Sequence, residues 1–192
     1  MYPFIKEAKL MDLSASGSDN KLVFSTPNEK ATVYLDASGM ISKVEHIDLK
    51  KNNESILTSK DIHQIVVGES NWTRDVYHFL KPNNEEHLQM RLGITIHRGE
   101  GTWSSLPHSF EKTPEVGFEE IFFYILKGGN GRGLQVGRGL WADGQEVDNV
   151  WRIENNTFGV VPMGHHPVVG EPLVSVSYVW AYLVKKKSWE KI

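Results

Sequence analysis

The sequence predicts an all-β protein built as an antiparallel sandwich or barrel. Short runs of β-branched and aromatic residues recur along its 192 residues, and turn residues separate them. The segments at residues 36–39, 127–131 and 142–145 each combine glycine with Asp or Asn, which tolerate positive φ at turns. A helical 3.6-residue period is suggested only in residues 3–13. About ten short strands at this spacing are typical of the two architectures.

Eleven strands are expected along the chain, and one polar stretch separates the first three from the rest. They span residues 21–25, 31–35, 40–46, 62–67, 73–80, 88–97, 118–126, 133–140, 147–153, 157–161 and 174–184. The polar stretch at residues 50–55 is interpreted as a loop between an N-terminal arm and the main barrel. We therefore place a domain boundary near residue 65, with residues 1–65 as the arm and 66–192 as the barrel.

Composition excludes several functional classes. The net charge of −3 and the pI of about 6.2 are too mild to favour nucleic acid or an anionic membrane as partner. The chain has no cysteine, which excludes disulfides, thiolate catalysis and cysteine-ligated zinc. Its N-terminus lacks a signal-peptide pattern, and no run approaches the ~18 apolar residues of a membrane helix. We expect a cytoplasmic protein that binds neither nucleic acid nor membranes.

Three residues form a pattern that suits a metal ion. His108 follows a proline, Glu120 begins an apolar strand, and His166 comes shortly after another strand. A carboxylate entering an apolar run is costly unless it is paired or bound to a metal. Imidazole and carboxylate suit Zn, Mn, Fe or Ni, and an open coordination position can polarise a substrate oxygen. Each residue also has a simpler interpretation, as a loop histidine, an ion-paired glutamate and an exposed histidine.

Five motifs, taken in order, resemble one known family. They read GTWSSLPH at residues 101–108, FEEIFFY at 118–124, GLQ at 133–135, PMGHHPVVGEP at 162–172 and SYVWA at 177–181. The chain resembles, over about residues 68–185, the cupin sugar isomerases typified by 5-deoxy-glucuronate isomerase and 5-keto-4-deoxyuronate isomerase. The resemblance implies an RmlC-like cupin, a jelly-roll barrel, with an N-terminal β extension. Residues 1–65 would then be a β arm or a reduced cupin half.

The resemblance also implies a metal site. His108, Glu120 and His166 match three of the family's four metal ligands, with Zn or Mn as the expected ion. The fourth ligand, the second histidine of a His-x-His pair, falls on Phe110, so weak binding of the ion is expected. Glu111 follows directly and is the candidate substitute for that ligand.

The resemblance also implies which residues face the substrate pocket that members of the family share. Gln135 matches one such residue, and the family's arginine beside it is replaced here by Val136, with Arg138 nearby. Tyr178 is a candidate to stack on a sugar, because alternation along a strand turns some aromatic residues inward. The family's asparagine in the last strand is Trp180.

The leading functional hypothesis is a metal-dependent aldose–ketose isomerase acting on a uronate or deoxy-sugar acid. Glu120 and Glu111 are the candidate proton carriers. A non-catalytic cupin that binds a sugar or sugar acid is one alternative. Another metal-cupin enzyme such as an oxygenase is a second, because two histidines and one carboxylate suffice for it. We also expect a homodimer, because the strand-rich N-terminal segment has edges to cover.

Overall fold

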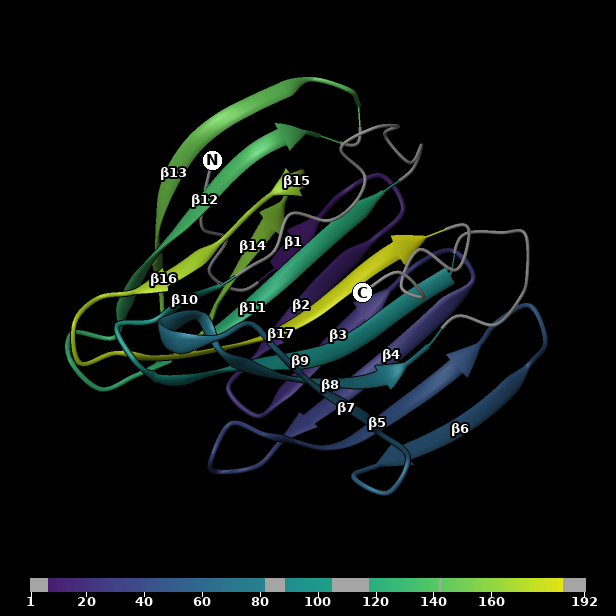
Figure 1. The fold of residues 1–192 in the computed structure, drawn as a ribbon. Helices are drawn as coiled ribbons and strands as arrows, with labels where there is room; N and C mark the ends of the chain where they lie inside the picture. Colours follow the sequence, from purple (N-terminus) through teal and green to yellow (C-terminus); the bar gives the residue numbers. More distant parts are fainter. Residues whose placement is uncertain (1–6, 82–88, 105–117, 142, 185–192) are drawn as a thin grey trace.

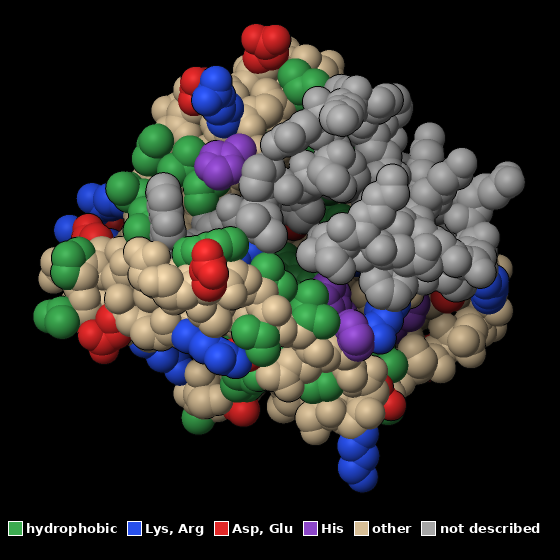
Figure 2. Space-filling view, viewed as in Figure 1, with side chains coloured by type: hydrophobic (Ala, Val, Ile, Leu, Met, Phe, Trp, Pro, Cys, Tyr) green, Lys and Arg blue, Asp and Glu red, His purple; other side chains and the backbone are tan. Residues whose placement is uncertain are grey.

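The computed structural model describes residues 7–81, 89–104, 118–141 and 143–184, and it is nearly all β (Figure 1). One short 3-10 helix, η1 (Ser70–Trp72), interrupts the strands. Within the described ranges, no helix is long and apolar enough to cross a membrane. Charged side chains of both signs are interspersed over the face shown in Figure 2, consistent with the mild net charge.

The strands form three antiparallel sheets, which we call N-terminal, central and distal. The N-terminal sheet is a meander of β1 (Glu7–Lys9), β2 (Ser14–Ser18), β3 (Lys21–Ser25), β4 (Glu29–Leu35), β5 (Ile41–Asp48) and β6 (Asn53–Thr58). The central sheet has the order β14 (Thr157–Val161), β11 (Glu119–Lys127), β17 (Ser175–Val184), β9 (Gln89–Glu100), β8 (Arg74–Leu80) and β7 (His63–Val67). The distal sheet contains β10 (Trp103–Ser104), β16 (Val168–Gly170), β12 (Arg132–Leu140), β13 (Glu146–Glu154) and β15 (Met163–His165).

The central sheet is buried on both faces, as β11 shows. Ile121, Phe123 and Ile125 join one apolar core with the N-terminal sheet. Phe122 and Tyr124, at the alternate positions, join a second core with residues of the distal sheet. A strand buried on both faces reads as a continuous apolar run, which explains why this segment is recognisable in the sequence.

The central and distal sheets face each other as an open barrel of the expected cupin type, and the N-terminal sheet is its β extension. Figure 1 shows β12 and β13 arching over the upper left, while β5 and β6 lie at the lower right. The all-β prediction is therefore confirmed. Each of the expected strands overlaps an observed one, and the structure adds β1, β2, β6, β10, β15 and β16.

The suggestion of a helix in residues 3–13 is wrong where the structure describes this segment. Residues 7–9 form β1, which pairs with β2 in antiparallel fashion. Ala8 and Leu13 are buried in the core beneath the N-terminal sheet. Packing against that core decides the conformation of this segment, since a weak local period carries little free energy by itself.

The interpretation of residues 50–55 as an interdomain loop is also wrong. Asp48 Oδ1 accepts hydrogen bonds from the backbone of Lys50 and Lys51, and Asn52 has a φ of 50°. These contacts form the turn of a β5–β6 hairpin inside the N-terminal sheet. The chain passes to the central sheet between residues 58 and 63, so the expected boundary near residue 65 falls within β7.

Candidate functional site

Polar side chains gather on the inner face of the central sheet, which looks toward the distal sheet. Strand register places Glu120 of β11 opposite Tyr182 of β17, and Tyr182 opposite Arg91 of β9. All three residues are at most 6% exposed. Polar groups at this depth need partners, so this face is where chemistry is expected.

Glu120 and His166 meet in this interior. Glu120 Oε2 lies 3.6 Å from His166 Nε2, and both side chains are almost fully buried. His166 belongs to the short connection between β15 and β16, and its Nδ1 lies 2.9 Å from the carbonyl oxygen of Gly164. A carbonyl only accepts hydrogen bonds, so Nδ1 carries a proton. Nε2 is the ring nitrogen that faces the Glu120 carboxyl group.

One oxygen of the Glu120 carboxyl group, Oε2, has no hydrogen-bond partner in the described part of the protein. Burial raises the pKa of Glu120 well above its usual range. A proton or a cation between Glu120 Oε2 and His166 Nε2, which face each other at 3.6 Å, would stabilise the buried carboxyl group. One imidazole nitrogen and one carboxylate oxygen are ligands that fit a divalent metal ion.

Gln135 lies beside this pair, on the inner face of β12. Its Nε2 donates to the carbonyl oxygens of His166 and Val136, each at 2.7 Å, and its Oε1 accepts from the Tyr124 hydroxyl at 3.0 Å. These contacts use both amide hydrogens and the carbonyl oxygen. The side chain expected to meet a substrate is thus engaged with the protein around His166.

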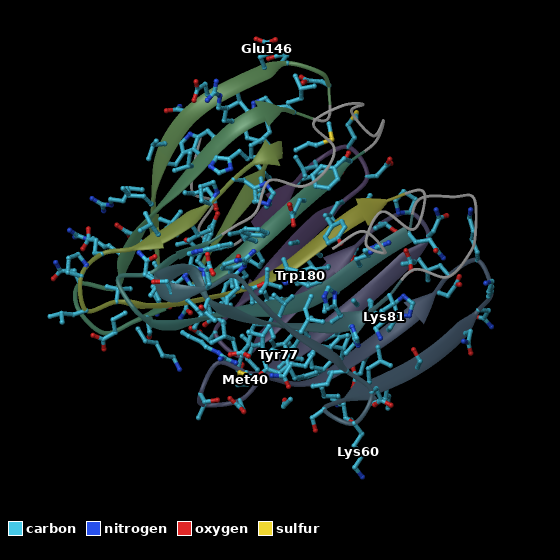
Figure 3. All side chains as sticks on the ribbon, in the orientation of Figure 1. Met40, Lys60, Tyr77, Lys81, Glu146 and Trp180 are labelled. Carbon is cyan, nitrogen blue, oxygen red and sulfur yellow. The ribbon has the colours of Figure 1, made fainter. Side chains whose placement is uncertain are left out.

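Aromatic rings line a further part of the inner face. Tyr178, the candidate for stacking, is stacked on Phe122 with ring centroids 4.4 Å apart. The ring of Phe122 in turn lies edge-on to His166 at 5.9 Å. Trp180, labelled in Figure 3, donates its indole N–H to Thr95 Oγ1 at 3.0 Å and covers Gly93. A Cβ at Gly93 would lie 2.4 Å from the Trp180 ring, so glycine is required beneath it.

Several buried polar residues of β9 were not among the site residues predicted from the sequence. The Arg91 guanidinium carbon lies 5.6 Å from the centroid of the Tyr182 ring. His97 Nδ1 lies 3.2 Å from Thr102 Oγ1, and burial lowers the pKa of His97 to about 4. Arg91, Thr95 and His97 occupy alternate positions of one strand, and that period of two was the available signal for a polar inner face.

The structure does not bring Arg138 into this group. Arg138 is an exposed residue of β12, and its closest described charged partner is Asp148 of β13, at 4.0 Å. Gln135 is three positions earlier and points inward, so Arg138 projects from the opposite face. The histidines of the chain are also distributed between surface and interior. Figure 2 shows histidine side chains at separate places on the surface, whereas His166 and His97 are buried.

Two expected site residues, His108 and Glu111, lie outside the described residues, as does Phe110. Among the residues that the structure describes, no group of three His, Asp or Glu side chains is arranged to hold a metal ion. The described part of the expected site is therefore the Glu120–His166 pair with its surroundings.

The fold and the buried pair define a cupin-type β-barrel protein with an interior polar site. The family model for the KduI/IolB family matches residues 16–192, and the chain belongs to that family. A relative named 5-deoxy-glucuronate isomerase, from Bacillus subtilis subsp. natto, is 30% identical over 105 residues, or 53% of this chain and 37% of the relative. A relative of the same name from Halalkalibacterium halodurans is 29% identical over 115 residues, or 58% of this chain and 41% of the relative.

The chain thus matches less than half the length of these curated relatives. Among solved structures, an IolB-like protein from Salmonella typhimurium LT2 superposes with a TM-score of 0.56 at 14% identity. The superposition covers 95% of this chain and 73% of that protein. At this identity the likeness supports the fold.

Proposed function

We propose that this protein is a metal-dependent aldose–ketose isomerase that acts on a uronate or deoxy-sugar acid. The observation that carries the proposal is the buried Glu120 Oε2, which has no hydrogen-bond donor among the described residues and faces His166 Nε2 at 3.6 Å. Membership of the KduI/IolB family and the two relatives named 5-deoxy-glucuronate isomerase support the choice of reaction and substrate class.

Glu120 and His166 would hold the ion, with His108 as the third ligand that the sequence pattern predicts. The hydrogen bond from His166 Nδ1 to a backbone carbonyl is the outer contact typical of a metal-binding histidine, because it orients the ring and directs Nε2 toward the ion. Zn or Mn is the ion expected for this ligand set. When bound, such an ion polarises the carbonyl and hydroxyl oxygens of a sugar.

The reaction itself moves hydrogen and adds no atoms. One proton leaves the hydroxyl-bearing carbon and one reaches the former carbonyl carbon, while the hydroxyl proton changes oxygen. Glu111 and Glu120 are the two candidates for the carbon-to-carbon transfer. For Glu120, burial raises the pKa of the carboxyl group above its usual range, which favours the form that carries a proton.

The aromatic walls serve this chemistry in two ways. Phe122, Tyr178 and Trp180 are each at most 5% exposed, so they exclude water from the interior. Their ring faces also suit the carbon–hydrogen surface of a sugar. A dry interior strengthens the attraction between a bound cation and the oxygens of an acidic substrate.

The test is metal content and turnover measured on the same preparations. We expect the purified protein to bind Zn²⁺ or Mn²⁺ and to isomerise at least one member of a panel of uronates and deoxy-keto acids. Glu120→Gln and His166→Ala should each lower metal affinity by about 100-fold or more and abolish turnover. His165→Ala is the matched control, because His165 is the adjacent histidine and is only half-buried.

Each outcome of this experiment separates the candidate functions. A protein that binds sugar acids without a metal or turnover would overturn the isomerase proposal in favour of a binding module. Metal-dependent consumption of oxygen would favour an oxygenase. Equal metal affinity in the wild type, Glu120→Gln and His166→Ala would show that this pair is not the site.

A further inference from the structure

The segment that carries His166 has little strand pairing of its own. β15 ends at His165 and β16 begins at Val168, so residues 166–167 lie between two short strands. A described backbone hydrogen bond to this segment runs from Val136 N–H to the carbonyl of Pro167, at 2.9 Å. The orientation of His166 therefore depends strongly on side chains that reach this connection.

The inner face of β11 approaches this connection at three successive inward positions. Glu120 faces the His166 ring nitrogen, and Phe122 lies edge-on to the same ring. Tyr124, the next inward residue, reaches it indirectly by donating its hydroxyl to Gln135 Oε1 at 3.0 Å. Both Tyr124 and Gln135 are at most 2% exposed.

The hydrogen bonds of Gln135 fix the direction of its amide. The Tyr124 hydroxyl donates to Oε1, which forces the NH₂ group toward the other side. There the NH₂ group meets the carbonyl oxygens of His166 and Val136 at 2.7 Å, with that of Pro167 at 3.3 Å. A reversed amide would set its oxygen against these carbonyls, so only one orientation is compatible with its surroundings.

We propose that Tyr124 and Gln135 act as a couple that positions His166, so that Nε2 faces Glu120 before any ion binds. The inference rests on the proposed function of the Glu120–His166 pair. The couple holds the backbone carbonyl of His166, while the Nδ1–H bond to Gly164 holds the ring. The first contact holds the backbone of His166 and the second holds its ring, so that together they fix the orientation and the tautomer of the ring. Neither Tyr124 nor Gln135 touches the ion or the reacting atoms, and each acts through His166.

The experiment compares three variants in the metal-free protein and in a zinc titration. Gln135→Leu removes the amide but retains much of its volume, and Tyr124→Phe removes only the hydroxyl. Thr95→Val is the control, because it breaks the Trp180–Thr95 hydrogen bond on the same inner face, with no contact to residues 166–167 among its described hydrogen bonds. The readouts are the His166 tautomer by ¹⁵N NMR, zinc affinity and the thermal midpoint.

We expect the wild type to show one His166 tautomer, with the proton on Nδ1. Gln135→Leu should give a mixture of tautomers and a zinc affinity about 10-fold weaker, the size of effect typical for a group that orients a metal ligand. Tyr124→Phe should act in the same direction with a smaller shift. Thr95→Val should lower the thermal midpoint and leave the tautomer and zinc affinity unchanged.

The proposal is overturned if Gln135→Leu loses thermal stability but keeps the wild-type tautomer and zinc affinity, since Gln135 would then only pack. If Gln135→Leu does not fold, the tautomer and zinc affinity of Tyr124→Phe decide in the same way. A wild type with no zinc affinity whose tautomer still changes in the variants would contradict the proposed function and support the positioning role.

Discussion

Glu119 and Glu120 are adjacent in β11 and equally buried, at 2% exposure each, yet they serve opposite faces of the central sheet. Glu119 faces the N-terminal sheet, where its carboxylate accepts the backbone N–H groups of Asp12 at 3.0 Å and Leu13 at 2.7 Å. Glu120 faces the barrel interior, where no described donor binds Oε2. Burial is the same for both, so hydrogen-bond satisfaction is what distinguishes a structural carboxylate from one available for chemistry.

The same contrast holds along the rest of the sheet. On the outer side, buried Glu29 accepts the Met90 N–H at 2.6 Å and lies 3.2 Å from His46 Nε2. On the inner side, His97 Nε2 is buried without a hydrogen bond to any described residue. The interface with the N-terminal sheet uses its polar groups to join two layers. In the barrel interior, by contrast, some buried polar atoms form no hydrogen bond with any described residue.

The sharpest test of this contrast makes the same change at both glutamates. Glu119→Gln should lower the free energy of unfolding by about 2–4 kcal/mol, because an amide replaces charge-assisted acceptors with a group that is half donor. Glu120→Gln should leave the stability of the metal-free protein unchanged or raise it slightly, because it removes a carboxyl group that is costly to ionise there. Urea denaturation of the two variants measures both effects, and equal losses would refute the contrast.

The inner face should also make stability sensitive to acid. Burial lowers the pKa of His97 to about 4, from 6.5 for the free side chain. A depressed pKa contributes stability that is present above pH 6.5 and is lost as the pH falls toward 4, by at most about 1.4 kcal/mol per pH unit. His97→Asn cannot gain this charge, so its unfolding free energy should fall less steeply over that window. Parallel curves for the two proteins would show that burial and the nearby positive charge of Arg74 do not keep His97 neutral.

A smaller effect, on self-association, is expected from changes at the β6 edge of the N-terminal sheet. β6 pairs only with β5 among the described strands, and its Ile56 side chain is 64% exposed. We predict that two copies of the chain associate and cover such edges. Light scattering at micromolar concentration should give about twice the 21.8 kDa chain mass, and Ile56→Lys should reduce it. A wild-type mass near 21.8 kDa would contradict the homodimer.

Strand prediction succeeded where burial dictates the residue types. β3 and β14 have the predicted limits, because runs of apolar residues are required where a strand contacts a core. β6 was missed because an edge strand with one exposed face tolerates Asn, Glu and Ser. β15 and β16 are three residues each, and their pairing with β12 depends on contacts distant in the chain.

The candidate site was predictable only in part. Glu120 and His166 follow from motif order, and the structure brings them together. The separation of Gln135 from Arg138 was readable from the odd spacing between them, since alternate residues of a strand face opposite ways. The engagement of Gln135 with the backbone near His166 was not readable, because it depends on where a connection from another part of the chain passes.

The Glu119 contact also has a consequence for how β11 is aligned. A slip of this strand by one residue would turn Glu120 away from the interior and direct Glu119 into it. The hydrogen bonds to Asp12 and Leu13 exist in one alignment only, and they link residues 107 and 106 positions apart. The N-terminal sheet thus sets the register of β11. When it packs on the barrel, it selects the alignment in which the carboxyl group of Glu120 faces His166.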